Sequence, residues 1–244
     1  MSDPIIDVRS LWKGFNGNPV LNGVDLQIDR GETVVVIGRS GCGKTVLLKH
    51  LIGLVRPDSG SVRIDGTELN GLRERDLNQI RLDIGMLFQE AALFDSLSVY
   101  DNVGFALHEH SDLDRDAIRA RVRECLGAVG LGDLRDCSVD ELSGGMKKRV
   151  ALARAIAQNP RILLYDEPTS GVDPMMAEEI NGLIRQLSAD LNVTSIVVTH
   201  ELDDALAVAD RIALLADGVI AAQGRAGDFA EMTDSEIRTF FERR

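Results

Sequence analysis

The chain has 244 residues, 44% of them apolar, which is enough for one α/β domain or for a domain with an inserted subdomain. Its 39 acidic and 27 basic residues give a formal charge of -12, which argues against nucleic acid as a partner and against direct attraction to anionic lipid. We therefore expect any membrane contact to run through a partner protein.

Cysteine usage and apolar runs restrict the possible compartments. Cys42, Cys125 and Cys137 form no CxxC or Cys/His pattern, so we expect neither a disulfide framework nor a zinc site, and a reducing cytosol fits best. Polar residues interrupt every apolar run well before the roughly 18 residues that a membrane span needs. The first residues show no signal-peptide pattern. No part of the chain is expected to span a membrane.

The first quarter of the chain predicts strand, loop and helix in that order. Apolar Val24, Leu26 and Ile28 alternate with polar residues, which indicates an antiparallel β region. A turn then leads into a buried strand over residues 33–37. A glycine-rich loop follows, and apolar residues at helical spacing over 46–52 predict a helix after it.

This loop fits the pattern G-x-x-x-x-G-K-[ST] in the context that the pattern requires. Its residues are Gly38, Arg39, Ser40, Gly41, Cys42, Gly43, Lys44 and Thr45. Backbone N–H groups of such a loop surround phosphates, the lysine reaches the outer two, and the Thr45 hydroxyl can bind Mg²⁺. We interpret Cys42 as a small residue that fills the loop, in preference to a redox switch.

The middle of the chain predicts helices, and the last third alternates strand and helix. Runs of β-branched residues stop from Gln89 to Leu142, where helical stretches indicate an inserted subdomain. Strands at 162–165 and 195–198 and helices at 177–187 and 205–209 then predict a mostly parallel sheet. Asp217-Gly218 suits a hairpin turn, and an amphipathic stretch at the end contains Ile237, Phe240 and Phe241.

Two further segments carry groups that suit a nucleotide site. The strand "ILLYDE" ends in Asp166 and Glu167, which can divide the tasks of binding the metal and orienting the attacking water. His200 follows the strand "SIVVTH", at the sheet edge where ligands of α/β proteins bind, and could contact the γ-phosphate.

The segment "ELSGGMKKRVALAR" predicts a second phosphate site. Ser143 can cap a helix over 146–158, Gly144 and Gly145 remove side chains from the approach, and the N-terminus of the helix attracts anions. Since a phosphate loop already exists about a hundred residues earlier, two half-sites on one chain suggest that each completes a site on another copy. The basic residues at 147–149 are interpreted as a feature of the helix terminus.

These motifs, in this order, resemble the nucleotide-binding subunit of ABC transporters over about residues 5–230. The resemblance implies a P-loop NTPase fold of the ABC ATPase type: an α/β fold with an N-terminal antiparallel β region, a mostly parallel core sheet and an inserted α-helical subdomain. It implies ATP and Mg²⁺ as ligands and a head-to-tail dimer that encloses two ATP molecules. Residues 1–88 and 160–230 would form the core, 89–159 the helical subdomain with the signature motif, and 231–244 a short tail.

The resemblance also assigns roles to individual residues. Glu167 would be the catalytic base, His200 the switch histidine, and Lys44 a catalytic phosphate contact. Mg²⁺ would be held by Thr45, Gln89 of the Q-loop and Asp166. The remaining nucleotide contacts would come from Phe15, which stacks on adenine, the loop from Gly38 to Val46, the signature residues Ser143, Gly144 and Gly145, and Asp173 of the D-loop. Met146 and Val46 depart from the commoner Gln and Thr.

Two stretches of the sequence indicate which group of transporters this ATPase would serve. The stretches "GMLFQEAALFDSLSVYDNV" and "LSGGMKKRVALARAIAQNP" are similar to ATPases of MCE-type, Mla-like transporters, which move phospholipids or other lipids in bacterial envelopes and plastids. This implies integral-membrane permease subunits, an MCE-type lipid-binding protein, and a position on the cytoplasmic face of the inner membrane. Among Leu93, Phe94, Leu97, Val99, Tyr100 and Phe105, most should be core, and some should line a groove for a permease helix.

Other functions are open at this point. Within transporters, the alternative is an importer of a small solute or a lipoprotein-releasing system, since these share the hydrolytic motifs. A soluble ABC ATPase for DNA repair or ribosomes usually carries two cassettes, coiled-coil insertions or basic tracts, which this chain lacks. A P-loop GTPase or small-molecule kinase would leave the "LSGG" segment unexplained, and a guanine-reading N-K-x-D motif is missing.

Overall fold

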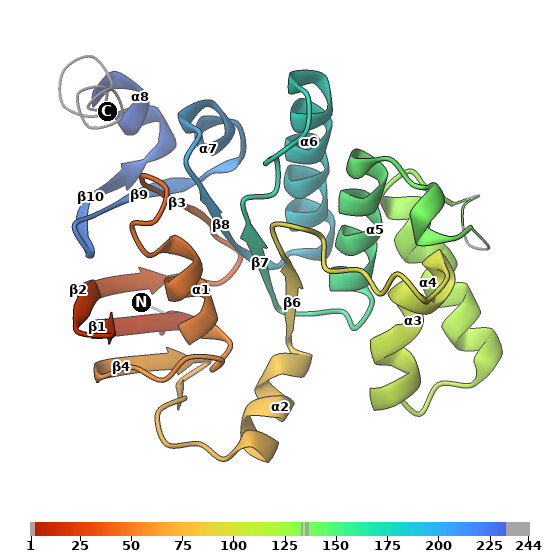
Figure 1. Cartoon of the computed structure of the whole chain (residues 1–244), viewed down its shortest axis with the longest axis horizontal. Helices are drawn as coiled ribbons and strands as arrows, with labels where there is room; N and C mark the ends of the chain where they lie inside the picture. Colours follow the sequence, from red (N-terminus) through yellow and green to blue (C-terminus); the bar gives the residue numbers. More distant parts are fainter. Residues whose placement is uncertain (1–2, 133, 135–136, 233–244) are drawn as a thin grey trace. The chain divides into compact units, whose positions relative to one another are not determined.

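The computed structural model describes residues 3–132, 134 and 137–232, and it divides into two compact units (Figure 1). The first unit comprises Met1–Arg81 and Thr194–Arg244, and the second comprises Leu82–Val193. The amphipathic stretch with Ile237, Phe240 and Phe241 lies outside the described residues, as does most of the predicted tail.

The first unit contains an antiparallel sheet near the N-terminus, as the alternating pattern predicts. Its strands lie in the order β2-β1-β4-β5. Their bounds are β1 (Ile6–Phe15), β2 (Asn18–Ile28), β4 (Ser59–Ile64) and β5 (Thr67–Glu68). Val24, Leu26 and Ile28 are buried whereas the residues between them are exposed, so the predicted face of β2 is confirmed.

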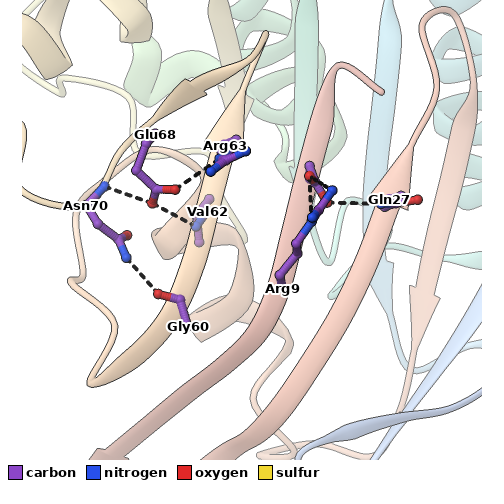
Figure 2. A network of polar contacts seen from close by, with 8 residues as sticks. Arg9, Gln27, Gly60, Val62, Arg63, Glu68 and Asn70 are labelled. Carbon is purple, nitrogen blue, oxygen red and sulfur yellow. Dashed lines mark hydrogen bonds and ion pairs between the residues drawn. The ribbon is translucent and has the colours of Figure 1, made fainter. Parts of the chain in front are cut away.

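Hydrogen bonds of polar and charged side chains connect neighbouring strands of this sheet (Figure 2). Asp7 of β1 is only 6% exposed and accepts hydrogen bonds from Arg9 at 2.9 Å and from Gln27 of β2 at 3.2 Å. The hydrogen bond from Arg9 is the main reason that the pKa of Asp7 is lowered. In the same sheet, Glu68 of β5 accepts hydrogen bonds from Arg63 and from the backbone N–H of Val62 (Figure 2).

The same unit contains four strands of a second sheet in the order β10-β9-β3-β8. Their bounds are β3 (Thr33–Ile37), β8 (Thr194–Thr199), β9 (Arg211–Ala216) and β10 (Val219–Arg225). β3 runs parallel to both β8 and β9, and all residues of β3 and β8 are buried, as expected for strands covered on both faces. β9 and β10 form the predicted hairpin through Asp217 and Gly218, which have φ of 49° and 79°.

Four helices accompany these sheets. They are α1 (Lys44–Leu51), α2 (Glu74–Leu82), α7 (Leu202–Val208) and α8 (Ala226–Met232). α1 buries Leu47, Leu48 and Leu51 and also His50, which is 1% exposed and whose Nδ1 lies 2.7 Å from the carbonyl oxygen of Val46. Since a carbonyl only accepts, Nδ1 carries the proton of this imidazole.

The second unit combines two parallel strands with helices (Figure 1). Its elements are β6 (Ile84–Leu87), α3 (Val99–His110), α4 (Arg115–Ala128), the 3₁₀ helix η1 (Val139–Glu141), α5 (Gly144–Ile156), β7 (Ile162–Asp166) and α6 (Pro174–Leu191). α3, α4 and α5 pack against one another, which confirms a helical region after β6. Arg121 of α4 donates hydrogen bonds to the carbonyls of Ile156 and Ala157, at the end of α5.

Among the described residues, the structure contains no helix with both the length and the apolar character that crossing a bilayer requires.

Replacing His50 with Leu should change how the stability depends on pH. Burial lowers the pKa of His50, so the unfolded chain binds the proton more tightly than the folded chain does. The free energy of unfolding of the native protein should therefore fall, relative to that of His50→Leu, as the pH drops below the ordinary histidine pKa of about 6.5. Urea unfolding between neutral and mildly acidic pH measures this difference, and a difference that does not vary with pH would contradict it.

Candidate nucleotide-binding and hydrolysis site

The loop between β3 and α1 depends on glycine at three places. A Cβ at Gly38 would lie 2.5 Å from the carbonyl oxygen of Leu215 and 2.7 Å from Sγ of Cys42. Gly41 and Gly43 have φ of +80° and +108°, a region that L side chains rarely adopt. The loop therefore has the left-handed turns that let a phosphate-binding loop direct N–H groups inward. The Cys42 sulfur fills the space beside Gly38, in agreement with its interpretation as a loop filler.

Lys44 at the start of α1 has its ammonium group directed back across this loop. Its side chain is 5% exposed, and Nζ donates hydrogen bonds to the carbonyl oxygens of Gly38 at 2.8 Å and Arg39 at 3.2 Å. Arg39 and Ser40 are exposed, whereas Thr45 and Val46 are partly exposed on the first turn of α1. A positive charge and a helix N-terminus thus meet at the same loop, which favours an anion there.

The structure places His200 beside this loop. β3 and β8 pair in parallel with Ile37 opposite Thr199, so Gly38 and His200 follow at the same edge of the sheet. His200 is exposed, and its Nε2 lies 3.1 Å from Oε1 of Glu201. This register agrees with the expectation that His200 lies at the sheet edge where ligands of α/β proteins bind.

Phe15, the predicted adenine contact, is the last residue of β1. Its ring is 43% exposed, and the ammonium group of Lys13 lies 5.3 Å from the ring centroid. The ring therefore offers an accessible π-face at the end of the antiparallel sheet.

In the second unit, Gln89 and the two acidic residues lie at the carboxyl ends of adjacent parallel strands. Leu87 of β6 pairs with Tyr165 of β7, so Gln89 lies close to the carboxyl end of the strand that contains Asp166. Asp166 and Glu167 are buried at 4% and 8% exposure. Gln89 is exposed, and its Nε2 lies 3.5 Å from Oγ of Ser170, at the outer limit for a hydrogen bond.

Glu167 has an unusual backbone conformation. Its φ is 47°, in the left-handed region that non-glycine residues rarely occupy, and such conformations are common where function fixes the chain. Its carbonyl accepts hydrogen bonds from the N–H of Ser170 at 3.1 Å and from Nζ of Lys148 at 3.3 Å. These two bonds act against relaxation of the strained peptide.

The signature segment begins helix α5 as the capping pattern predicts. Ser143 is the N-cap, and its hydroxyl accepts a hydrogen bond from the N–H of Met146 at 3.3 Å. The helix begins at Gly144, not at Met146 as expected, because a capping residue is followed directly by the first helical residue. Gly144 is exposed, and a Cβ added there would meet nothing within 4 Å. Gly144 therefore leaves the approach to the N-terminus of α5 open.

Asp173 caps the neighbouring helix α6. Its side chain accepts a hydrogen bond from the N–H of Met176 at 3.0 Å. Met176 also packs against α5, because a Cβ at Gly145 would lie 2.6 Å from its sulfur. Arg149 of α5 pairs with Glu179 of α6. The signature helix and the helix that follows the D-loop segment are thus in direct contact within this unit.

The sequence did not predict the environment of one basic residue. Lys148 lies near the helix terminus, as expected, but it is 5% exposed and its ammonium group donates a hydrogen bond of 2.6 Å to the carbonyl of Gln89. Burial lowers the pKa of Lys148, and the carboxylates of Glu167 and Asp166 offset part of this effect. The helical pattern offers a signal, since Lys148 lies four and eight residues before buried Leu152 and Ile156 and therefore on the same side of α5.

Sequence reasoning also missed Arg154. The two alanines after Glu90, Ala91 and Ala92, have φ of 60° and 48°. The guanidinium of Arg154 donates hydrogen bonds to their carbonyls at 2.7 and 2.6 Å. Burial lowers the pKa of Arg154. No residue type in "EAAL" signals this left-handed pair, because alanine favours helix.

The residues predicted for Mg²⁺ suit the ion chemically. Among the described residues, no group of three or more His, Cys, Asp or Glu side chains could hold a metal ion by itself. Mg²⁺ in nucleotide sites commonly uses one or two protein oxygens together with phosphates and water. Thr45, Gln89 and Asp166 offer a hydroxyl, an amide and a carboxylate, which are the hard oxygen donors that Mg²⁺ prefers.

Comparison with known proteins agrees with this set of motifs. The profile of the family described as ABC transporter matches residues 21–170. The intermembrane phospholipid transport system ATP-binding protein MlaF of Haemophilus influenzae is 38% identical over 240 residues, which cover 98% of this chain and 91% of the relative. The methionine import ATP-binding protein MetN of Nocardia farcinica is 42% identical over 246 residues, which cover 98% of this chain and 73% of the relative.

A solved structure shows the same fold. The ATP-binding cassette MJ0796, in a dimeric post-hydrolysis state bound to ADP and Pi, has a TM-score of 0.84 and 33% identity, with 91% of this chain and 98% of that chain covered. The family profile spans more than half of the sequence and includes both the glycine-rich loop and the strand that ends in Asp166. The chain therefore belongs to the ABC transporter family, as an ATPase subunit that couples ATP hydrolysis to transport.

Proposed function

We propose that this ATPase powers the movement of phospholipid or a related lipid across or between bacterial envelope membranes. The observation that supports this most is the similarity to MlaF, which extends over nearly the full length of both proteins. The stretches around Gln89 and after Ser143 resemble the same group of lipid transporters.

The ATP would be bound by the loop and hydrolysed with the help of Glu167. Backbone N–H groups of residues 38–45 and the ammonium group of Lys44 would hold the phosphates, and Phe15 would stack on the adenine. Glu167 would act as the base that orients the attacking water. His200, beside the loop, would contact the γ-phosphate. A bound Mg²⁺, held by Thr45, Gln89 and Asp166, would offset phosphate charge.

A second copy of the chain would complete each site. Ser143 and Gly144 lie at the N-terminus of α5, where a Cβ at Gly144 would meet nothing within 4 Å and the N–H groups of a helix N-terminus favour an anion. In a head-to-tail dimer, these groups and Asp173 would face the ATP held by the other subunit. The dimeric state of MJ0796 supports this arrangement. Closure of the dimer on ATP and its reopening after hydrolysis would then drive the transporter.

The permease would bind the second unit, at the cytoplasmic face of the inner membrane. Phe94 and Phe105 are 46% and 42% exposed, and their ring centroids lie 4.9 Å apart. Of the six apolar residues predicted in this stretch, Val99 alone is buried, whereas Leu93, Leu97 and Tyr100 are partly exposed, so the expectation that most of them are core is wrong. Two exposed aromatic rings in contact form a surface that an apolar helix of a partner can cover. The complex would also contain an MCE-type lipid-binding protein.

Import of a small solute is the second candidate function. MetN is 42% identical, a higher value than that of MlaF, although this chain covers less of it. Because hydrolytic motifs are shared among these transporters, identity alone does not separate the two cargoes. Purification of the native complex through this subunit tests the proposal: co-purified permease and MCE-type subunits with phospholipid support it, and a solute-binding protein without lipid contradicts it.

Replacing Glu167 with Gln should stop turnover and retain ATP. The variant keeps the size of the side chain but removes the base, so steady-state ATP hydrolysis should fall by about 100-fold or more while ATP binding persists. Size-exclusion chromatography with light scattering should show an ATP-dependent dimer that the native protein forms only transiently. A variant that hydrolyses ATP at the native rate would remove Glu167 from this role.

Replacing Phe105 with Glu should weaken binding of the permease. The added charge would have to be buried against an apolar partner, which is costly, while ATP binding should not change. Co-purification with the permease measures the effect. Leu113→Glu is a matched control, because Leu113 is also exposed, at 46%, and lies outside the Phe94–Phe105 pair. Equal loss of the permease in both variants, or no loss in Phe105→Glu, would contradict the assignment.

A further inference from the structure

Lys148 occupies a place that lysine rarely takes. It lies on the first turns of α5, five residues after Ser143, and is 5% exposed, whereas its neighbour Lys147 is partly exposed. Burying an ammonium group costs free energy unless hydrogen bonds and opposite charges compensate for the lost water. An apolar residue of similar length would avoid this cost, so the contacts of the ammonium group need an explanation.

These contacts are with two residues proposed to act in hydrolysis. Nζ donates hydrogen bonds to the carbonyl oxygen of Gln89 at 2.6 Å and to that of Glu167 at 3.3 Å. The first bond is short and charge-assisted, so it is among the stronger hydrogen bonds available to a lysine. Both acceptors are backbone atoms. Lys148 therefore holds the backbones of both residues.

Left-handed residues, whose conformation needs stabilising contacts, occur at or near both acceptors. Glu167 has φ of 47°, and the segment that follows Gln89 contains two left-handed alanines. Arg154, six residues after Lys148 on the same helix, binds the carbonyls of these alanines. Since a left-handed backbone is unfavourable for any residue other than glycine, such a conformation persists only where surrounding contacts fix it. α5 supplies these contacts at both places.

We propose that Lys148 is a positioning residue that couples the signature segment to hydrolysis, by fixing the backbones of Gln89 and Glu167 to the helix that Ser143 caps. The inference rests on the proposed roles of Glu167 and of the signature segment. When Ser143 and Gly144 engage the ATP of the other subunit, a displacement of α5 reaches Glu167 through Lys148. Binding at one site thereby alters the position of the base that serves the other site.

Replacing Lys148 with Met tests this role. The side chain keeps its apolar stem but loses the donor, so kcat for ATP hydrolysis should fall by about 10- to 100-fold, the effect expected of a misplaced catalytic group. KM for ATP should stay within about threefold, because the phosphate-binding loop does not change. Lys147→Met on the same helix is the matched control and should retain the native kcat. A native kcat in Lys148→Met would overturn the proposal.

A double-mutant cycle separates positioning from general damage. If Lys148 acts through Glu167, Lys148→Met should lower the single-turnover rate of the native protein but not that of Glu167→Gln any further. Losses that multiply in the double variant would show that Lys148 acts elsewhere, and would overturn the proposal. Lys148→Arg retains a cationic donor and should recover part of kcat, which a purely space-filling role would not predict.

The same measurements distinguish a failure of this inference from a failure of the proposed function. If Glu167→Gln hydrolyses ATP normally, the proposed base is wrong, whatever Lys148 does. If Glu167→Gln is inactive and Lys148→Met is normal, only the role of Lys148 fails. Thermal unfolding checks that Lys148→Met is folded. If Lys148→Met does not fold, the double-mutant cycle is run with Lys148→Arg. Losses of the single-turnover rate that multiply with those of Glu167→Gln would again contradict the proposal.

Discussion

The parallel pairing of strands decides where the glycine-rich loop, His200, Gln89 and Glu167 lie. In the first unit, Ile37 pairs with Thr199, so the phosphate-binding loop and His200 emerge at one sheet edge. In the second unit, Leu87 pairs with Tyr165, which brings the segments of Gln89 and Glu167 together in the same way. A slip of the register would separate these groups, because parallel strands place their carboxyl ends at a common edge. Buried apolar strands such as β3 and β7 maintain that register.

Helix α5 gives the second unit its functional organisation. Its N-terminus presents Ser143 and Gly144, and its first turns hold the backbones of Gln89 and Glu167 through Lys148. Further along, Arg149 pairs with α6 and Arg154 fixes the left-handed alanines. One rigid helix therefore connects the group that would sense the partner's ATP with groups that would act on the chain's own ATP.

Motifs with their own chemistry could be predicted from the sequence. The glycine-rich loop, the acidic end of "ILLYDE" and the cap at Ser143 combine residue types whose local roles are strongly constrained, and the family comparison confirms the fold that they imply. The strand over 33–37 matches β3 residue for residue. These predictions succeeded because a backbone φ, a cap or a buried apolar run is specified by neighbouring residues.

Tertiary contacts of the cationic residues could not be predicted in this way. The sequence shows Lys148 only as part of a basic run at a helix terminus, and the residue types at Ala91 and Ala92 give no sign of a left-handed backbone. Their actual environments depend on which segments α5 meets after folding, about sixty residues away in the sequence for Gln89. Partners, cargo and the roles of the site residues likewise depend on molecules that the chain alone does not contain.

Mixing two inactive variants tests the central claim most directly. Lys44→Met would disable the glycine-rich loop. Gly144→Asp would add a carboxylate that repels the phosphates of ATP at the signature segment. It should cause no steric clash within its own subunit, since a Cβ there meets nothing within 4 Å. If each ATP lies between the loop of one chain and the signature segment of another, a mixed dimer contains one intact site, and the mixture should hydrolyse ATP faster than either variant alone. A mixture as inactive as its components, under conditions where the subunits are shown to exchange, would contradict the head-to-tail account.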